Sequence, residues 1–299
     1  ALAERWRLSA GLRHSQVRFR SRDDYIAPGN PDDSGALGFS RTTPVLGLLF
    51  EAGADWQLYA NAGTGFETPT FAELAYRADG GSGLNDALRP ARSRHVELGA
   101  RGQRAGLRWD ATLFSARTED ELVVQASQGG RTVFANGGLT RRRGAELSFD
   151  LPLAPDWSLA ASATWLDARY LRDVCSAPAC GPGELRIVAG NRLPGVATRW
   201  AWAELRHDLG ESTTLLLEAR ATSGYFADDL NTARAPGHAL LGLGAEHRFG
   251  AARRWTAWAR LDNLLDREVI GSVIVNEGNG RYFEPAPGRT LMLGLRLSP

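Results

Sequence analysis

The chain has 299 residues, of which 43% are hydrophobic and 23% are charged, and its formal net charge is +1 from 35 basic and 34 acidic residues. Such a balanced charge gives no positive field for polyanions, so nucleic acid is excluded as an expected partner. No run reaches the roughly 18 apolar residues that a transmembrane helix needs. Helical membrane proteins are therefore excluded, but barrels are not, because lipid-facing residues of a barrel strand occupy only every second position.

The segments of alternating polar and apolar residues predict strands joined by connections of two lengths. In chain order, the predicted strands cover residues 2–22, 38–51, 56–66, 95–101, 107–124, 131–151, 157–170, 197–209, 213–226, 238–249, 255–269 and 291–297. About twelve strands, about five tight turns and about six longer loops alternate, which is the asymmetry of outer-membrane barrels. We find no linker that would divide the chain.

The two faces of each predicted strand differ. Val96, Leu98 and Ala100 share one face, whereas Glu97 and Arg101 share the other. In a membrane wall the apolar face would meet lipid and the charged face a wet interior. Alternation by itself fits a half-buried sheet of a soluble protein equally well, so a soluble β-sheet binding module stays open as an alternative.

The two cysteines, Cys175 and Cys180, lie in the sequence CSAPAC within a stretch rich in Gly and Pro. Two thiols are too few ligands for a structural zinc site, so we expect a disulfide, which suits an oxidising compartment. The alternative is two free thiols.

Signals for catalysis are poor. The five histidines have no metal-binding spacing, and Ser15, Ser93 and Ser223 lack the context of a nucleophile elbow, so we predict no catalytic residue, no metal site and no cofactor. An outer-membrane esterase is the weakest of the alternatives. The run from Arg141 to Arg143 has two interpretations, a solvated bend or guanidinium groups that point into a barrel lumen.

The stretch 261–289 combines a strand end, a long polar excursion and a strand restart, and it is the strongest of several motifs. The others are YANAGTGFETPTFAELAY (59–76), TLFSARTEDELVV (112–124), NGGLTRRRGAEL (136–147) and GNRLPGVA (190–197). Together they resemble the C-terminal barrel half of TonB-dependent outer-membrane receptors.

This resemblance implies an all-β, antiparallel transmembrane barrel domain over residues 1–299, about the last 12 strands of a barrel of about 22. It also implies a Gram-negative outer membrane, contact with its lipid, and active uptake without enzymatic chemistry. The TonB complex would act through an N-terminal region, with the plug and first strands, outside this chain. The missing initiator Met, and the end at Leu297, Ser298 and Pro299 where family members usually have an aromatic residue, lead us to expect a piece of a longer protein.

A narrower resemblance is to the pyrroloquinoline quinone receptor subtype, through GFETPTFAELAYRADG, NTARAP and GSVIVNEGNGRYFEPAPGR. A planar quinone with several carboxylates calls for arginines and aromatic faces in the loops. The expected ligand-binding residues are Tyr76, Arg77, Arg131, Tyr170, Arg172, Tyr225, Arg281 and Tyr282. A ferric-siderophore receptor and a passive porin-type channel stay open as alternatives.

Overall fold

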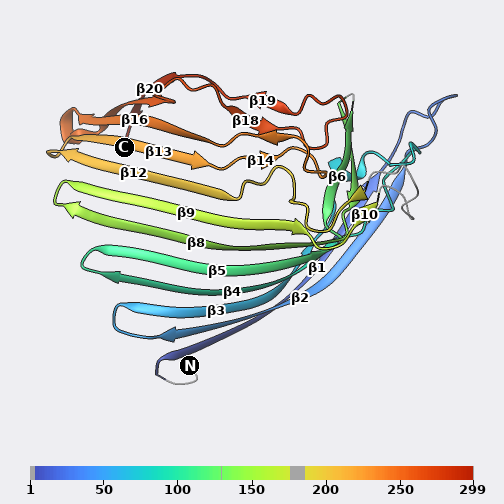
Figure 1. Ribbon diagram of the computed structural model, residues 1–299, viewed down its shortest axis with the longest axis horizontal. Coiled ribbons are helices and arrows are strands. Elements are labelled where there is room, and N and C mark those ends of the chain that lie inside the picture. Colours follow the sequence, from blue (N-terminus) through green and yellow to red (C-terminus); the bar gives the residue numbers. More distant parts are fainter. Residues whose placement is uncertain (1–3, 129, 176–185, 299) are drawn as a thin grey trace.

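The computed structural model describes residues 4–128, 130–175 and 186–298. Its main element is a 12-stranded antiparallel sheet in which each strand pairs with its neighbours in the order β1-β2-β3-β4-β5-β8-β9-β12-β13-β16-β17-β20 (Figure 1). The strands of this sheet are β1 (Trp6–Ser21), β2 (Gly35–Glu51), β3 (Trp56–Glu67), β4 (Ala91–Arg104), β5 (Leu107–Glu119), β8 (Leu139–Ala154), β9 (Trp157–Tyr170), β12 (Arg199–Leu209), β13 (Thr213–Thr222), β16 (His238–Phe249), β17 (Trp255–Asp262) and β20 (Thr290–Leu297).

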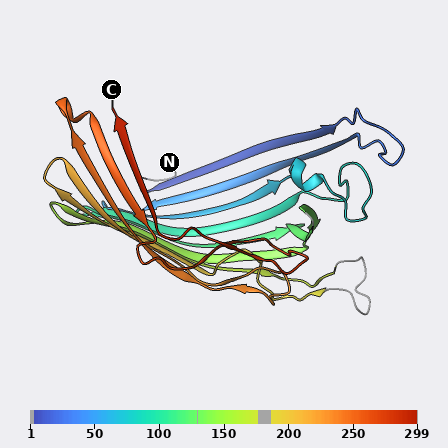
Figure 2. The same ribbon diagram turned by 90° about the horizontal axis from the view of Figure 1, so that it is seen from above.

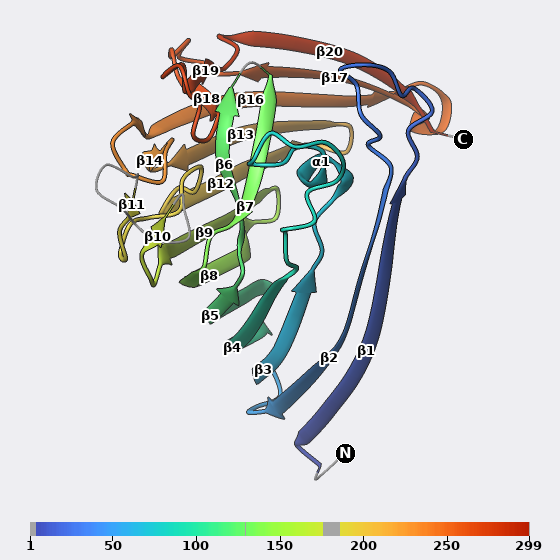
Figure 3. The same ribbon diagram turned by 90° about the vertical axis from the view of Figure 1, so that its right-hand side faces the viewer.

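The sheet is strongly curved, and the first strands (blue) and the last strands (red) stand at its two edges (Figure 2). Viewed along the strands it forms an open arc (Figure 3). The predicted all-β barrel wall of twelve strands is thereby confirmed, and no separate plug domain is present among the described residues. In this part of the chain, no helix is long and apolar enough to cross a membrane.

Connections of different length gather at opposite ends of the strands (Figure 1). At one rim the described sheet has short turns, at residues 52–55, 105–106, 155–156, 210–212 and 250–254, the last with the 3-10 turn η1 (Ala251–Arg253). At the other rim lie the long connections, at residues 22–34, 68–90, 120–138, 171–198, 223–237 and 263–289. The predicted alternation is therefore confirmed.

Four of the predicted strands are too long at the loop rim: 213–226 ends at Thr222 and 255–269 ends at Asp262, and two others are broken. Asp120 has φ +56° and Gly138 has φ +74°, and neither conformation belongs to an extended strand. The predicted strands 107–124 and 131–151 therefore divide into β5 and β8 of the wall and a separate hairpin, β6 (Leu122–Gln128) and β7 (Arg131–Asn136). In Figure 3 this hairpin lies inside the arc of the sheet.

Other loops carry short two-stranded ribbons of their own. These are β10 (Val174–Cys175) with β11 (Arg186–Ile187), β14 (Tyr225–Phe226) with β15 (Arg234–Ala235), and β18 (Ile270–Val273) with β19 (Phe283–Pro285). The connection 68–90 also holds a helical turn, α1 (Phe71–Leu74), which sequence periodicity did not predict.

The two faces of the wall differ as predicted. Leu98 and Leu113 are directly paired on the outer face, where they are 57% and 61% exposed. On the inner face, the Tyr59 hydroxyl crosses β4 and lies 2.7 Å from the Thr112 hydroxyl of β5. The fully buried side chains of the described residues lie in the loops or at the loop ends of the wall strands, and they include Leu74, Thr140 and Tyr170. This buried layer supports the loops.

Candidate functional site

A pocket of about 550 Å³ lies between the connection 68–90 and the β6–β7 hairpin. This volume is within the range of small-molecule sites. Apolar side chains line part of it, and glycines 80, 81 and 83 leave backbone groups accessible. The other lining residues are Ser21, Asp33, Phe71, Ala75, Tyr76, Arg77, Ser82, Leu84, Arg131 and Val133.

The start of the connection is fixed by a capped helical turn. The Thr70 hydroxyl accepts a hydrogen bond from the Glu73 backbone N–H, while the Glu73 carboxylate accepts one from the Thr70 backbone N–H at 2.6 Å. This reciprocal capping box satisfies donors that a short helix leaves free. Because Leu74 is fully buried, the turn fixes the chain two residues before Tyr76, which lines the pocket.

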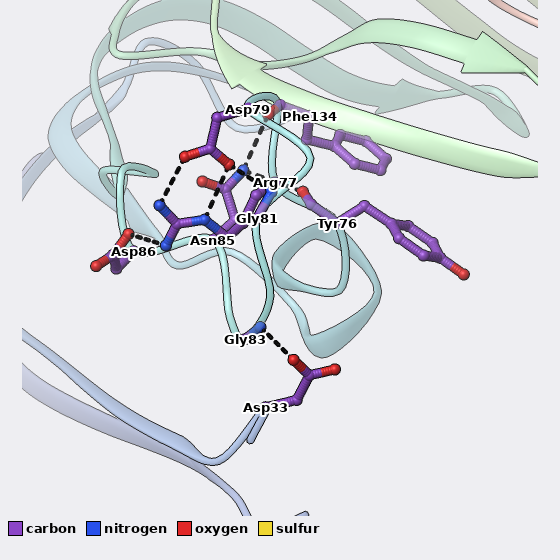
Figure 4. A network of polar contacts seen from close by, with 9 residues as sticks. All are labelled: Asp33, Tyr76, Arg77, Asp79, Gly81, Gly83, Asn85, Asp86 and Phe134. Carbon is purple, nitrogen blue, oxygen red and sulfur yellow. Dashed lines mark hydrogen bonds and ion pairs between the residues drawn. The ribbon is translucent and has the colours of Figure 1, made fainter. Parts of the chain in front are cut away.

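Asn85 joins the connection to the hairpin. Its side-chain amide donates to the backbone carbonyls of Tyr76 and Phe134, both at 3.3 Å (Figure 4). A second attachment links Asn136 of β7 with Arg89. The Arg89 backbone N–H donates to the Asn136 side-chain oxygen, and the Asn136 side-chain amide donates to the Arg89 carbonyl, both at 2.8 Å. The two attachments hold β7 against the connection 68–90, and Arg131, at the start of β7, lies beside Tyr76.

Arg131 and Tyr76 form the centre of the site. The guanidinium carbon of Arg131 lies 5.4 Å from the centre of the Tyr76 ring, which is a cation–π distance. Arg131 is exposed and, among the described residues, takes part in no ion pair. A cation that is held against an aromatic face and still lacks a carboxylate can receive a planar anion.

Arg77 lines the same pocket, but acidic neighbours occupy its guanidinium (Figure 4). Its Nε and Nη2 donate to the two carboxylate oxygens of Asp79 at 3.0 and 2.8 Å, and its Nη1 donates to Asp86 at 2.9 Å. The hydrogen bonds to Asp79 raise the pKa of Arg77, and in turn they lower the pKa of Asp79. Arg77 therefore braces the loop, and its role in ligand binding stays a prediction.

Tyr170, another predicted ligand residue, lies away from the surface. Its side chain is fully buried and its hydroxyl donates to the Asp229 carboxylate at 2.7 Å, so its ring offers no face to a ligand in this structure. Asn276 completes the cluster, since its side-chain amide donates to Asp229 at 2.7 Å and its side-chain oxygen accepts from the Asp229 backbone N–H at 3.0 Å.

This Tyr170–Asp229–Asn276 cluster connects three loops. The Asn276 backbone carbonyl accepts from the Ser127 N–H at 3.2 Å, which attaches the connection 263–289 to the hairpin. Burial raises the pKa of Asp229. The sequence did not predict Asp229 or Asn276 as supporting residues. The only local signal was the turn composition around Asn276, which agrees with its φ of +53°.

The four remaining predicted ligand residues are dispersed over the loops, and none of them lines the pocket. Arg281 is exposed on the connection that Asn276 attaches, and Tyr282 follows it with its ring 6.1 Å from Phe283. Arg172 is exposed after β9, whereas Tyr225 is partly buried in β14. Burial raises the pKa of Tyr225.

The predicted disulfide depends on Cys180, which lies outside the described residues. In the parts of the chain that are described, no group of three or more His, Cys, Asp or Glu side chains could hold a metal ion.

A larger cavity, of about 940 Å³, lies at the short-turn rim. Two of its three arginines have partners, since Arg108 pairs with Asp150 at 3.3 Å and Arg101 donates to Gln57 at 3.2 Å. The third, Arg104, is exposed. The loop pocket differs from this cavity because its own lining combines the Arg131 guanidinium with the face of the Tyr76 ring.

Comparisons with known proteins agree with this architecture. A family model described as "TonB dependent receptor-like, beta-barrel" matches residues 1–264. The probable TonB-dependent receptor BfrD of Bordetella pertussis is 26% identical over all of this chain and 39% of its own length. The ferrichrome receptor FcuA of Yersinia enterocolitica is 25% identical over 97% of this chain and 36% of its own length.

Among solved structures, the ferric yersiniabactin uptake receptor FyuA of Yersinia pestis superposes with a TM-score of 0.73 at 21% identity, over 99% of this chain and 43% of that one. At this identity the likeness shows the fold alone. The chain spans less than two fifths of the length of the curated relatives described above.

Proposed function

Since this chain belongs to the TonB dependent receptor-like β-barrel family, a family of outer-membrane transport receptors, we propose that it is one barrel domain of a receptor for a scarce anionic small molecule. The receptor lies in the outer membrane, where lipid surrounds its wall. Energy for uptake comes from the TonB complex, which contacts a region outside residues 1–299. The chain itself performs no chemical conversion.

The observation that supports an anionic cargo is the stacking of Arg131 on Tyr76 within the loop pocket. The nearby Arg77 is neutralised by Asp79 and Asp86, so Arg131 supplies the available positive charge of this pocket. Arg281 and Tyr282 belong to a loop that is hydrogen-bonded to the same hairpin, and they extend the proposed ligand surface. Arg172 and Tyr225 lie at its margin.

Pyrroloquinoline quinone fits the planar cation–aromatic pair and the narrower resemblance in the stretch 65–80. A ferric siderophore is the second candidate, because a curated relative is a ferrichrome receptor. Both cargoes need a cation in the loops when they carry carboxylates.

The test is ligand titration of the purified complete receptor, followed by intrinsic tryptophan fluorescence, with pyrroloquinoline quinone and with ferric citrate as an anionic iron complex. Arg131→Gln is expected to weaken binding of the preferred anion roughly 10- to 100-fold, the usual worth of a hydrogen bond to a charged group. Arg77→Gln serves as a comparison that loosens the loop, and Arg104→Gln is the matched control, because it removes an exposed arginine from the opposite, short-turn rim.

Unchanged affinity in Arg131→Gln would show that the pocket does not bind the anion. Binding of ferric citrate without binding of the quinone would select the iron complex. If uptake into cells continues after the TonB complex is removed, active transport is rejected in favour of a passive channel.

A further inference from the structure

Arginines from neighbouring strands form a continuous row at the loop rim of the wall. Arg94 of β4 pairs directly with Arg117 of β5, Arg117 with Arg141 of β8, and Arg141 with Arg169 of β9. An isolated bridge continues the row from Arg169 to Arg192. Like charges directly opposite each other destabilise a sheet, so this row needs compensation from elsewhere.

The first four arginines of the row belong to the outer face. Leu113 of β5 is outward and 61% exposed, and Arg117 lies four residues further along the same strand, hence on the same face. The distance along the strand is roughly 13 Å. Trp165 of β9, which is 43% exposed, lies between the apolar band and Arg169 on this face. Tryptophan is enriched at the boundary between hydrocarbon and headgroups.

Protein carboxylates compensate only part of this charge. Asp167, whose side chain is 7% exposed, lies 2.6 Å from Arg169 Nε, 3.4 Å from Arg143 Nε and 3.6 Å from Arg141 Nη2. One carboxylate thus faces three guanidinium groups. The Nε of Arg141 is buried without a hydrogen-bond partner.

Arg94 and Arg117 are exposed, and no ion pair or hydrogen bond engages their side chains in the described parts of the chain. The next pair toward the loops, Arg92 and Glu119, has opposite charges and adds no net charge. Arg142, which lies on the inner face, is by contrast fully paired, because its two terminal nitrogens donate to the two oxygens of Glu121 at 3.0 and 2.7 Å. The excess positive charge therefore belongs to the outer face.

We propose that this outer arginine patch, Arg94, Arg117, Arg141, Arg143 and Arg169, binds the phosphate groups of outer-leaflet lipid headgroups. The inference rests on the proposed membrane location but not on the cargo. Guanidinium groups bind phosphate through paired hydrogen bonds, and headgroups lie at the height of the patch, just beyond the apolar band. The bound lipid would relieve the repulsion along the row.

The experiment measures lipid retention by native mass spectrometry of the complete receptor in neutral detergent, titrated with bis-phosphorylated lipid A. The test variant is Arg94→Gln with Arg117→Gln, which leaves the Asp167 cluster intact. We expect roughly thirtyfold weaker retention, from the usual contribution of two cations near a membrane surface. Arg94→Lys with Arg117→Lys should retain most of the binding, because the charges remain.

The matched control is Arg13→Gln with Arg296→Gln, which removes the same charge from the opposite face of the wall. It should bind lipid A like the unaltered receptor, and a thermal unfolding curve of each variant verifies folding. Equal retention by the test variant and the control would overturn the proposal. So would equal binding of lipid A without phosphates, or displacement by millimolar inorganic phosphate, which would assign the patch to the free anion.

Failure of this proposal is distinct from failure of the proposed function. A receptor that binds its anionic cargo but loses no lipid in the test variant rejects the patch alone. A receptor that does not enter vesicles of phosphatidylethanolamine and phosphatidylglycerol rejects the membrane location, and the lipid proposal with it.

Discussion

Arg77 and Arg131 line one pocket, and their neighbours give them different roles. Two carboxylates from its own loop surround Arg77, whereas Arg131 stacks on Tyr76 and keeps its charge available. The same contrast applies to Arg141 and Arg142, which are adjacent in sequence but belong to opposite faces of β8. A basic residue in the sequence thus acquires its role from the partners that the fold supplies.

The Arg77–Asp79 contact predicts a pH dependence of the loop. The pKa of Asp79 is lower in the folded protein than the ordinary value of about 3.9, so the contact stabilises the loop fully above that value and weakens progressively as the pH falls from it toward the lowered pKa. Hydrogen exchange, corrected for the intrinsic exchange rate, should show a smaller protection factor of the Gly81 N–H, which donates to Asp79 at 2.9 Å, at pH 3 than at pH 6. Asp79→Asn, which carries no charge at either pH, should show the same protection factor at both. Equal protection of the unaltered protein at both values would contradict the role of this contact.

At the scale of the strands, glycines allow large side chains of one strand to lie flat over the backbone of the next. Tyr59 of β3 lies flat over Gly99 of β4, and a Cβ atom at Gly99 would lie 2.2 Å from the Tyr59 Cζ. Trp258 lies over Gly294 in the same manner, with a closest distance of 2.1 Å. The Tyr59 side chain thereby reaches Thr112 of β5, a strand that does not pair with β3, and so it stiffens the curved sheet.

Gly99→Ala is therefore expected to displace Tyr59 and to lower the free energy of unfolding of the complete receptor by about 1–3 kcal/mol, the usual cost of overpacking. Denaturant unfolding monitored by fluorescence measures the change. Gly38→Ala in β2 is the control, because a Cβ there has no atom within 4 Å. If Tyr59 is the obstacle, adding Tyr59→Leu to Gly99→Ala should recover part of the loss, and an additive loss would exclude this explanation.

At the scale of the whole molecule, the wall separates an apolar exterior from a polar interior. Leu147 and Glu146 are neighbours in β8 on opposite faces, and both are exposed in the structure. Only a surrounding solvent that differs between the two faces accounts for this arrangement, because a large apolar face left in water would be unfavourable. The exterior fits lipid and the interior fits water.

Leu147→Arg is expected to destabilise the complete receptor in a bilayer by about 2–4 kcal/mol if this position is near the membrane midplane. Glu146→Arg, with the same new side chain on the other face, should change the stability far less. Unfolding in phospholipid vesicles compares the two variants. A similar loss in both would mean that the outer face is not in contact with hydrocarbon.

The sequence alone determined the class of fold, the number of strands and the ends at which short turns and long loops gather. These features depend on alternation and turn residues, which are local and have a fixed period of two. The sequence did not predict the helical turn at Phe71–Leu74, because a single capped turn is too short to show a helical period. It did not predict the separate β6–β7 hairpin either, because the two residues with positive φ that break the strands leave the alternation unchanged.

Only the tertiary structure decided which of the predicted ligand residues could meet. It brought Tyr76 and Arg131 together through Asn85, neutralised Arg77, and buried Tyr170 against Asp229. It also aligned arginines of four strands into one outer row. Contacts of this kind join residues that are far apart in the chain, so they depend on register and loop packing and cannot be obtained from local alternation.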